Sequence, residues 1–540
     1  MAEQQTGIQV QEHAGSEQAI AETPTAVAAF VGRCLRGPVN RPIRLSGFAD
    51  FQRIFGGLWQ PSTLSYAVEQ YFENGGRSAY VVRVANGARC CTLTLRAGGG
   101  SLVLQALAPG TREFLRAAVD YDGIGDNEED QFNLVLQRIR TPGSEHIEDQ
   151  EIYRRLTVLP DAARHVTTTL ADSQIARVLG TVPSQRPDPT PHSDPRGIAG
   201  YVMSSPDGDD GGALTDYDLI GSAARGTGLF ALDAVETFNF LCIPPLARDT
   251  DVGACTLLVA NRYCRERRAL LFVDPPITWD SAGKALAEMR DWPLPSDTAC
   301  MYFPRLLAFD KLRGRFETFA PSGAVAGTLS RSAEGAPVWS AMTGEDTALR
   351  PGLRPACAVD DNYRVRLIAC GVNTVQTVRR PGREMPIACT MAGPGAGAAD
   401  WRMLAARRLA FMIINSIERG TRWMLFEPNE PATWRRAAAQ VRSFLASLEE
   451  RGAFAHRGPG ECWFVLCDER VNREQHRERG IVNLMFGFAA ARPGEFHAYM
   501  ISHRAGGSSV QAVSPNLTGL PGTGITQVLE ELELPVVSMG

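Results

Sequence analysis

The clearest structural signal in the chain is WRMLAARRLAFMIINSIERGTRWMLFEPNEPATWRRAAAQVRSFLASLEERGAF, residues Trp401–Phe454. Apolar residues cover most of the helical circumference at its start, which predicts a helix over Asp400–Arg419 that is buried on more than one side. Asp400 is placed to cap this helix. A strand, TRWMLFEP, and a helix over Thr433–Arg451 are predicted to follow. A helix buried in this way implies a core that is shared with neighbouring elements.

Charged residues interrupt the apolar pattern of the first helix at Arg402, Arg407, Arg408 and Arg419. One interpretation is a solvated fringe, in which ion pairs contribute ~0–1 kcal/mol each. The other interpretation is a set of charge contacts between subunits, which would give specificity to an assembly. The pattern is compatible with both.

Upstream of this region, strands and helices alternate. The apolar runs FNFLCIPP, ALLFVDPP and CMYFPRLLAFD are separated by the helical patterns VGACTLLVANRYCRER and SAGKALAEMRDW. Near the N-terminus, TAVAAFVG and Ser78–Val84 read as strands, with helices over Phe48–Gly57 and Leu64–Asn74 between them. Apolar strands separated by helices predict a largely parallel sheet that is covered on both faces.

Residues 91–200 have a different character. Alternating runs such as LVLQAL and FNLVLQRI predict a β-rich region. Five prolines in Thr181–Gly197 predict an extended connection. The acidic stretches Asp120–Gln131 and Pro206–Asp218 lack the calcium-loop spacing, and we interpret both as solvated turns.

Composition excludes several classes of function. The 540 residues carry a net charge of −5, so no strong basic field is present to hold nucleic acid or an anionic membrane. No apolar run reaches the ~18 residues of a transmembrane helix, and MAEQQTGIQVQEHAGSEQAI has no signal-peptide pattern. The 12 cysteines are therefore expected to be reduced, buried thiols of a cytoplasmic product, without metal-site spacing.

Motifs of catalysis are not found. The sequence has no GxSxG elbow and no HExxH pair, and its scattered histidines read as surface or structural residues. Asp274 and Ser281 flank a strand-to-helix turn, but no nearby histidine completes a triad. AGPGAGA lacks the context of a phosphate loop. We therefore predict no catalytic, cofactor-binding or metal-binding residues, no cofactor and no enzymatic activity.

Read together, these segments resemble contractile phage tail sheath proteins. In the C-terminal domain of that family, an Arg-Arg helix is followed by a Glu-x-Gly turn, a Phe-Glu-Pro-Asn segment and a Trp-containing helix. The residues of this chain that match them are, in the same order, Arg407 and Arg408, Glu418–Trp423, Phe426–Asn429 and Trp434. The stretch from TPTAVAAFVG to SAYVVRV and the stretch APSGAVAGTLSRSAEGAPVW are similar to further segments of the family, in the same order.

The resemblance implies a multidomain fold of the α/β and α+β classes. A conserved inner α/β domain is expected from both chain ends, residues 23–90 plus 346–503. A β-rich module (91–200) and an α/β module of subtilisin-like topology without catalysis (201–345) are expected as insertions. Residues 1–22 are expected to be a linking arm and 504–540 a C-terminal extension.

The resemblance also implies function. Sheath subunits form hexameric rings that stack helically around an inner tube, and they contract. The implied partners are further copies of this chain, the inner tube protein, and baseplate and cap proteins, with no nucleic acid and no membrane insertion. The implied place is a phage tail or tail-like particle, assembled in the bacterial cytoplasm and, for some systems, released.

Terminal arms of sheath subunits add strands to a neighbour's sheet. The candidate linking residues are Ile8, Val10 and Ile20 in the N-terminal arm. On the C-terminal side the linking strand is expected in Phe496–Ile501, with Phe496, Tyr499 and Ile501 as its candidates, or in Ser508–Val513. The alternatives that stay open are a sheath-like cap or baseplate-associated protein that does not polymerise, and a hydrolase that uses Ser281.

Overall fold

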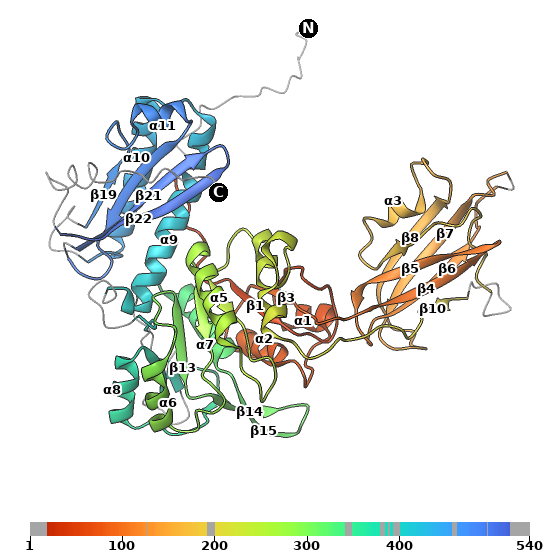
Figure 1. Cartoon of the computed structure of the whole chain (residues 1–540), viewed down its shortest axis with the longest axis horizontal. Helices are drawn as coiled ribbons and strands as arrows, with labels where there is room; N and C mark the ends of the chain where they lie inside the picture. Colours follow the sequence, from red (N-terminus) through yellow and green to blue (C-terminus); the bar gives the residue numbers. More distant parts are fainter. Residues whose placement is uncertain are drawn as a thin grey trace, which may run out of the picture.

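The computed structural model describes residues 19–125, 127–191, 200–340, 348–377, 384–386, 389–392, 400–455, 462–493 and 495–518. These residues form an α/β unit, a β-rich unit that projects from it, and a C-terminal unit (Figure 1). The coarse prediction of a mixed α/β chain with separate sheets is confirmed.

A single sheet organises the α/β unit, and its described strands have the order β18-β17-β13-β12-β11-β1-β3-β2. All pairs from β3 to β17 are parallel, as the apolar runs predicted, whereas β2 and β18 are antiparallel edge strands. The strands are β1 (Ala28–Gly32), β2 (Ile43–Leu45), β3 (Ala79–Arg83), β11 (Phe240–Cys242), β12 (Leu270–Val273), β13 (Ala299–Phe303), β17 (Val372–Thr377) and β18 (Glu384–Pro386).

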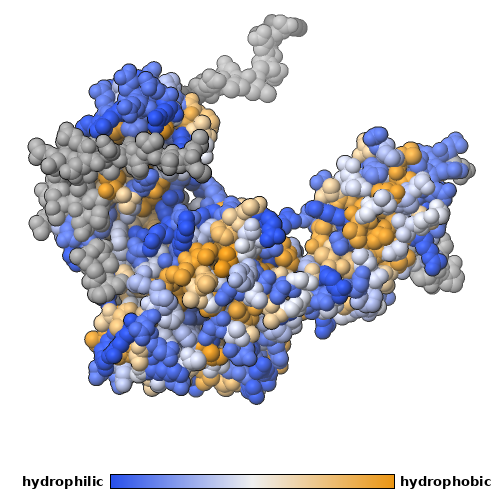
Figure 2. All heavy atoms as spheres, in the orientation of Figure 1, coloured by the Kyte–Doolittle hydropathy of each residue, from blue (hydrophilic) through white to orange (hydrophobic). Residues whose placement is uncertain are grey.

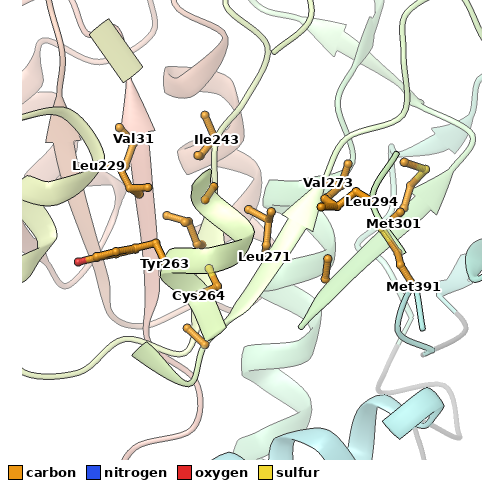
Figure 3. Close-up of a cluster of buried hydrophobic side chains, with 14 of the residues drawn as sticks. Val31, Leu229, Ile243, Tyr263, Cys264, Leu271, Val273, Leu294, Met301 and Met391 are labelled. Carbon is orange, nitrogen blue, oxygen red and sulfur yellow. The ribbon is translucent and has the colours of Figure 1, made fainter. Parts of the chain in front are cut away.

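Helices cover both faces of this sheet, because successive side chains of a strand point to opposite sides. Val31, Leu271 and Met301 pack in the cluster of Figure 3, which η2, α5, α6 and α8 complete. Phe30 and Phe272 point to the opposite face, where α1, α2 and α7 complete the cluster. These helices are α1 (Phe48–Phe55), α2 (Thr63–Glu73), η2 (Gly228–Ala234), α5 (Ala254–Arg267), α6 (Ala282–Glu288), α7 (Ser322–Gly335) and α8 (Asp361–Ala369).

Smaller elements complete the unit. β14 pairs with β15 and β16 in a separate small sheet. These elements are α4 (Asp216–Ile220), η1 (Ala223–Arg225), η3 (Met289–Asp291), β14 (Leu306–Asp310), β15 (Arg315–Phe319) and β16 (Arg354–Pro355).

The β-rich unit consists of two packed sheets, with the orders β4-β5-β9 and β10-β6-β7-β8. Their facing residues, among them Leu104, Leu134 and Leu156, form one buried core. The elements are β4 (Cys90–Ala97), β5 (Gly100–Pro109), β6 (Phe114–Asp120), β7 (Gln131–Ile139), β8 (Ile147–Thr157), α3 (Val166–Leu170), β9 (Ala176–Leu179) and β10 (Val202–Met203).

The C-terminal unit packs two long helices against an antiparallel sheet of order β19-β20-β21-β22. Ile413, Trp434 and Phe486 lie in its core. The elements are η5 (Asp400–Arg402), α9 (Leu404–Gly420), η6 (Arg422–Phe426), α10 (Pro431–Glu450), β19 (Trp463–Leu466), α11 (Glu474–Glu478), β20 (Val482–Phe488), β21 (Glu495–Arg504) and β22 (Gly507–Thr518).

Two local predictions in this unit are wrong. TRWMLFEP is not a strand, because a helical turn continues past Thr421 into η6. Asp400 does not cap the long helix, which begins at Leu404. Instead, the Asp400 carboxylate is taken by Arg492 and His497.

The predicted division into domains does not follow the sheets. β1 pairs with β11, with Ala28 opposite Phe240, so strands of 23–90 and of 201–345 lie in one sheet, and the α/β module as a separate unit stays a prediction. The boundary at 503/504 also falls inside a hairpin, since β22 pairs with β21. The reason is that parallel strands pair with spatial neighbours that are distant in the chain. The two chain ends do meet, as Thr23 N donates to Ser416 Oγ at 2.9 Å.

Candidate functional site

The C-terminal sheet ends in β22, and the outer edge of this strand is unpaired among the residues that the structure describes. β21 pairs with β20 on one side and with β22 on the other. Within the described ranges, no strand pairs with the second edge of β22. Unpaired backbone N–H and C=O groups along such an edge are a template for a strand of another chain.

A cleft of about 530 Å³ opens beside this hairpin, between α9 and the C-terminal end of α5. Phe411, Ile414 and Val510 give it an apolar lining, and charged residues stand among them. The charged lining residues are Arg265, Glu266, Arg268, Asp297 and Arg407.

Arg407 forms the charged wall of the cleft, with its side chain only 10% exposed. Its Nη2 lies 2.9 Å from Asp297 Oδ2, and its guanidinium lies over the rings of Trp401 and Phe411, at 4.8 and 4.5 Å from their centroids. Arg265 Nη2 lies 3.6 Å from the same Asp297. One carboxylate thus faces two guanidinium groups, so these three residues carry a net positive charge.

A second polar contact ties β21 to η5. His497 Nε2 lies 3.4 Å from Asp400 Oδ2, and both side chains are buried. The His497 ring also lies 4.0 Å from the centroid of Trp401. Arg492 Nε approaches the other oxygen of Asp400 at 3.3 Å. The start of the long helical region is therefore fixed to the sheet that carries the free edge.

His503 holds the hairpin to the end of α9. Its Nε2 lies 2.8 Å from Thr421 Oγ1 and its Nδ1 lies 2.7 Å from Ser508 Oγ. Burial lowers the pKa of His503 to about 4, with Glu418 raising it and Arg422 lowering it further. The imidazole is therefore neutral near pH 7. A neutral ring can donate to one of its two hydroxyl neighbours and accept from the other.

The structure gives each of the four predicted arginines a partner within its own chain. Arg402 Nη2 donates to the carbonyl groups of Ile368 and Ala369, at 2.6 and 2.8 Å, at the end of α8. Arg419 lies 3.4 Å from Glu236 on the surface. The contacts of Arg407 are those of the cleft wall.

Arg408 is the most deeply buried of them. It donates to Thr25 O at 3.3 Å, and its guanidinium lies 5.3 Å from the Phe240 centroid. Burial lowers the pKa of Arg408 to about 10. The interpretation as a solvated fringe is therefore wrong for Arg407 and Arg408, while a contact between subunits stays a prediction.

The predicted linking residues have different outcomes. Ile8 and Val10 lie outside the described residues, whereas Ile20 is 8% exposed in the chain's own C-terminal core. Phe496, Tyr499 and Ile501 lie on β21, which is paired on both edges. Among the described residues both edges of that strand are paired within the chain, so the linking role of these three residues stays a prediction. The other candidate, Ser508–Val513, lies on the edge strand β22.

The proposed hydrolase residues do not form a catalytic arrangement. Asp274 accepts hydrogen bonds from Ser322 N and Oγ, at 3.0 and 2.9 Å, at the start of α7. Burial raises the pKa of Asp274 to about 6, although Arg305 opposes the shift. Ser281 lies at the N-cap of α6. Asp274 therefore caps α7 and does not orient a base.

In the part of the chain that the structure describes, no group of three or more His, Cys, Asp or Glu residues is arranged to hold a metal ion. No helix there is long and apolar enough to cross a bilayer.

Sequence reasoning missed Asp297 as the partner of Arg407. The available signal was an acidic residue two positions before the apolar run Ala299–Phe303. Its partner lies about a hundred positions away in the chain, so no local spacing could connect the two.

Comparison with known proteins gives a consistent fold. No protein-family model matches the sequence, and no curated protein matches it. The sheath tail protein Lin1278 from Listeria innocua aligns with a TM-score of 0.60 at 12% identity, over 90% of this chain and 97% of that one. The sheath tail protein DSY3957 from Desulfitobacterium hafniense aligns with a TM-score of 0.52 at 13% identity, over 92% and 100%.

A structure of the PVC sheath complex of an extracellular contractile injection system, in the contracted state, aligns with a TM-score of 0.52 at 16% identity. The alignment covers 92% of this chain and 96% of that one. A chain in a baseplate structure of the anti-feeding prophage aligns with a TM-score of 0.51 at 16% identity, over 91% of this chain and 97% of that one. This chain therefore has the fold of contractile tail sheath proteins, and the resemblance read from the sequence is confirmed.

Proposed function

We propose that this chain is the structural subunit of a contractile sheath. It polymerises as hexameric rings that stack helically around an inner tube, and the sheath contracts to drive that tube through a target envelope. The observation that carries the proposal is the edge of β22 beside the cleft, which no strand of the described residues pairs, in a chain with the sheath fold. None of these roles needs a catalytic residue or a cofactor.

Strand addition explains why an open edge suits such an assembly. A donor strand gains one backbone hydrogen bond for each paired group, worth a net ~0.5–1.5 kcal/mol, without a preformed pocket. The apolar residues Phe411, Ile414 and Val510 can bury every second side chain of that strand. We assign the donor role to the N-terminal residues of a neighbouring copy, with Ile8 and Val10 as the apolar positions.

The same contact tolerates movement of the subunits. A head-to-tail contact that does not close generates a helical filament. Rotation of one globular body against the next can leave the added strand paired while other surfaces repack, which is the kind of transition that contraction requires. We assign inter-subunit charge contacts to Arg402, Arg407, Arg408 and Arg419, in addition to their contacts within the chain.

The partners that complete the proposal are the inner tube protein and the baseplate and cap proteins at the two ends. The particle is a phage tail or a tail-like injection system, assembled in the bacterial cytoplasm. Support comes from the extracellular contractile injection system and the anti-feeding prophage among the similar structures.

A second candidate is a sheath-like protein that sits at a baseplate and does not polymerise. It is favoured by the similarity to a chain in the anti-feeding prophage baseplate structure. Electron microscopy of the purified full-length chain in chelator separates the candidates. We expect hollow tubes or stacked rings at high concentration, and a monodisperse monomer would contradict the sheath proposal.

A further inference from the structure

The β-rich unit is joined to the α/β unit by two passes of the chain, 84–89 and 204–215. Figure 2 shows that, on the face in view, the surfaces of the two units meet along a short boundary. The two passes pair with each other, Asn86 opposite Gly212 and Arg89 opposite Asp209. Arg89 N donates to Asp209 O and Asp209 N to Arg89 O, each at 2.9 Å.

The backbones at this joint touch directly. A Cβ on Gly211 would lie 2.3 Å from Asn86 O, and Gly211 has a φ of +75°. A Cβ on Gly208 would lie 2.4 Å from Gly110 O. Only glycine allows this approach, so the second pass packs directly on the backbone of the first pass and of the loop after β5.

A buried arginine bonds both units at once. Arg83, at the end of β3, is 1% exposed. Its Nη1 donates to Gly37 O of the α/β unit at 2.6 Å and to Pro109 O of the β-rich unit at 2.8 Å. Burial lowers the pKa of Arg83, and the charges of Asp210 and Glu113 act against that shift.

Residues interpreted from the sequence as a solvated acidic turn take part in this joint. Asp210 accepts from Thr111 N and Oγ1, at 2.9 and 2.7 Å. Asp207 accepts from Thr92 N and Oγ1, at 3.0 and 2.7 Å. The second chain pass is therefore fixed to β4 and to the loop after β5.

An ion pair forms a second connection at a distance from Arg83. Arg36 of the α/β unit pairs with Glu148 of β8, and the two side chains are 10% and 11% exposed. Arg36 Nη2 also donates to Arg53 O at 2.8 Å, and Arg140 Nε lies 3.4 Å from Glu148. Burial alone would raise the pKa of Glu148, but hydrogen bonds and charges of Arg36 and Arg140 outweigh it and lower the pKa.

Open space lies beside this pair. A groove of about 830 Å³ runs between the two units, lined by Phe48, Leu58 and Glu73 on one side and by Arg112 and Arg140 on the other. Without a second connection, the β-rich unit would have room to tilt into the groove about the two chain passes.

We propose that Arg83 and the Arg36–Glu148 pair clamp the β-rich unit at one fixed angle, so that it moves with the α/β unit as a single body. Two connections at separate points fix an orientation, whereas two chain passes alone would act as a hinge. In any assembly, a rotation of the α/β unit then carries the β-rich unit with it. The inference concerns a single chain and does not depend on the proposed function.

The test measures the distance between two spin labels by pulsed electron paramagnetic resonance. The labels are placed on Thr94→Cys in β4 and Arg262→Cys in α5, both exposed, in a background of Cys255→Ser and Cys370→Ser, which removes the exposed cysteines. Labelled full-length chain is diluted with unlabelled chain, so that distances within one subunit dominate. We expect one narrow distribution.

Arg83→Met keeps a flexible, unbranched side chain but is shorter than arginine and has no guanidinium, so both hydrogen bonds of Nη1 are lost, and we expect a broader and shifted distribution. The matched control is Arg89→Met in the same joint, whose side chain is 71% exposed and pairs with Asp209 at the surface. The control should keep the narrow distribution. A broad distribution in the unsubstituted chain would overturn the clamp.

Glu148→Gln provides an independent test, because Glu148 lies at the second connection, away from Arg83, and glutamine has nearly the same size as glutamate. It should broaden the distribution, and adding Arg36→Met should broaden it little further if both residues act through their pair. A narrow distribution in Glu148→Gln and in Arg83→Met would overturn the proposal. If Arg83→Met fails to fold, as judged by circular dichroism, the Glu148 arm alone decides.

Discussion

Arg407 Nη2 lies 2.9 Å from Asp297 Oδ2, and this ion pair fastens α9 to the residues that lead into β13. The two side chains are 10% and 25% exposed, so the pair is partly shielded from water. It joins two regions with different buried clusters, the parallel sheet and the C-terminal unit.

Removal of the Asp297 charge should weaken this joint. Asp297→Asn leaves Arg407 and Arg265 without their shared carboxylate, and we expect a loss of about 2–4 kcal/mol, because an unpaired charge stays largely buried. The measurement is hydrogen exchange of α9 together with the thermal unfolding midpoint. The control is Glu236→Gln, which removes the exposed pair with Arg419 and should cost at most about 1 kcal/mol. Equal effects of both variants would contradict the structural role of Asp297.

Stability should fall in acid through His503. Its pKa is lowered by burial from 6.5 to about 4, so between these values the unfolded chain binds the proton and the folded chain does not. The free energy of unfolding therefore decreases as the pH drops through this window, by up to roughly 3 kcal/mol.

Thermal unfolding at a series of pH values measures this effect. His503→Gln should flatten the part of the profile between pH 6.5 and 4, because glutamine does not titrate. His146→Gln is the control, since His146 is exposed, and it should leave the profile unchanged. An unchanged slope in His503→Gln would refute the assignment.

Truncation of the N-terminus should separate assembly from folding. Ile20 is buried against Gly420, where an added Cβ would lie 2.8 Å from Ile20 Cγ1, and Thr23 bonds Ser416. Deletion of residues 2–18 should therefore leave the unfolding midpoint unchanged and abolish tubes, or restrict assembly to single rings. Deletion of 2–22 should also destabilise the fold, by about 2–4 kcal/mol for the loss of the Ile20 side chain.

Electron microscopy and thermal unfolding of both truncated chains check this prediction. Normal tubes from the chain without residues 2–18, stable in high salt, would show that another segment links the subunits. Because Ile20 lies in the chain's own C-terminal core, the end of the predicted linking arm 1–22 also packs within its own subunit.

Removal of the β-rich unit should leave the remaining fold intact. Gly212 N donates to Asn86 O at 2.9 Å, so residues 87–211 can be replaced by Asn-Gly, which closes the two passes as a two-residue hairpin. We expect native circular dichroism and continued polymerisation, because β1, β3 and β11 pair without any residue of that unit. A folded chain that no longer polymerises would place the β-rich unit within the assembly interface.

Much of the secondary structure could be read from local patterns. The strand at Ala28–Gly32, the helices at Phe48–Phe55 and Thr63–Glu73, and the apolar strands of the parallel sheet are where periodicity predicted them. Gly56, with a φ of +88°, ends its helix in the left-handed conformation that favours glycine. These features depend on residues a few positions apart, so a sequence window contains their causes.

The sequence by itself therefore determined most of the elements, their amphipathic faces, the buried helix at the start of Trp401–Phe454 and the resemblance to tail sheath proteins. Only the tertiary structure decided which strands share a sheet, which edge stays free and which charges meet. It placed β1 beside β11, made β21 internal and β22 the edge, and brought Asp297 to Arg407. The physical reason is that strand pairing and buried ion pairs form between residues far apart in the chain, where the packing of whole units sets the partner and local propensity has no influence.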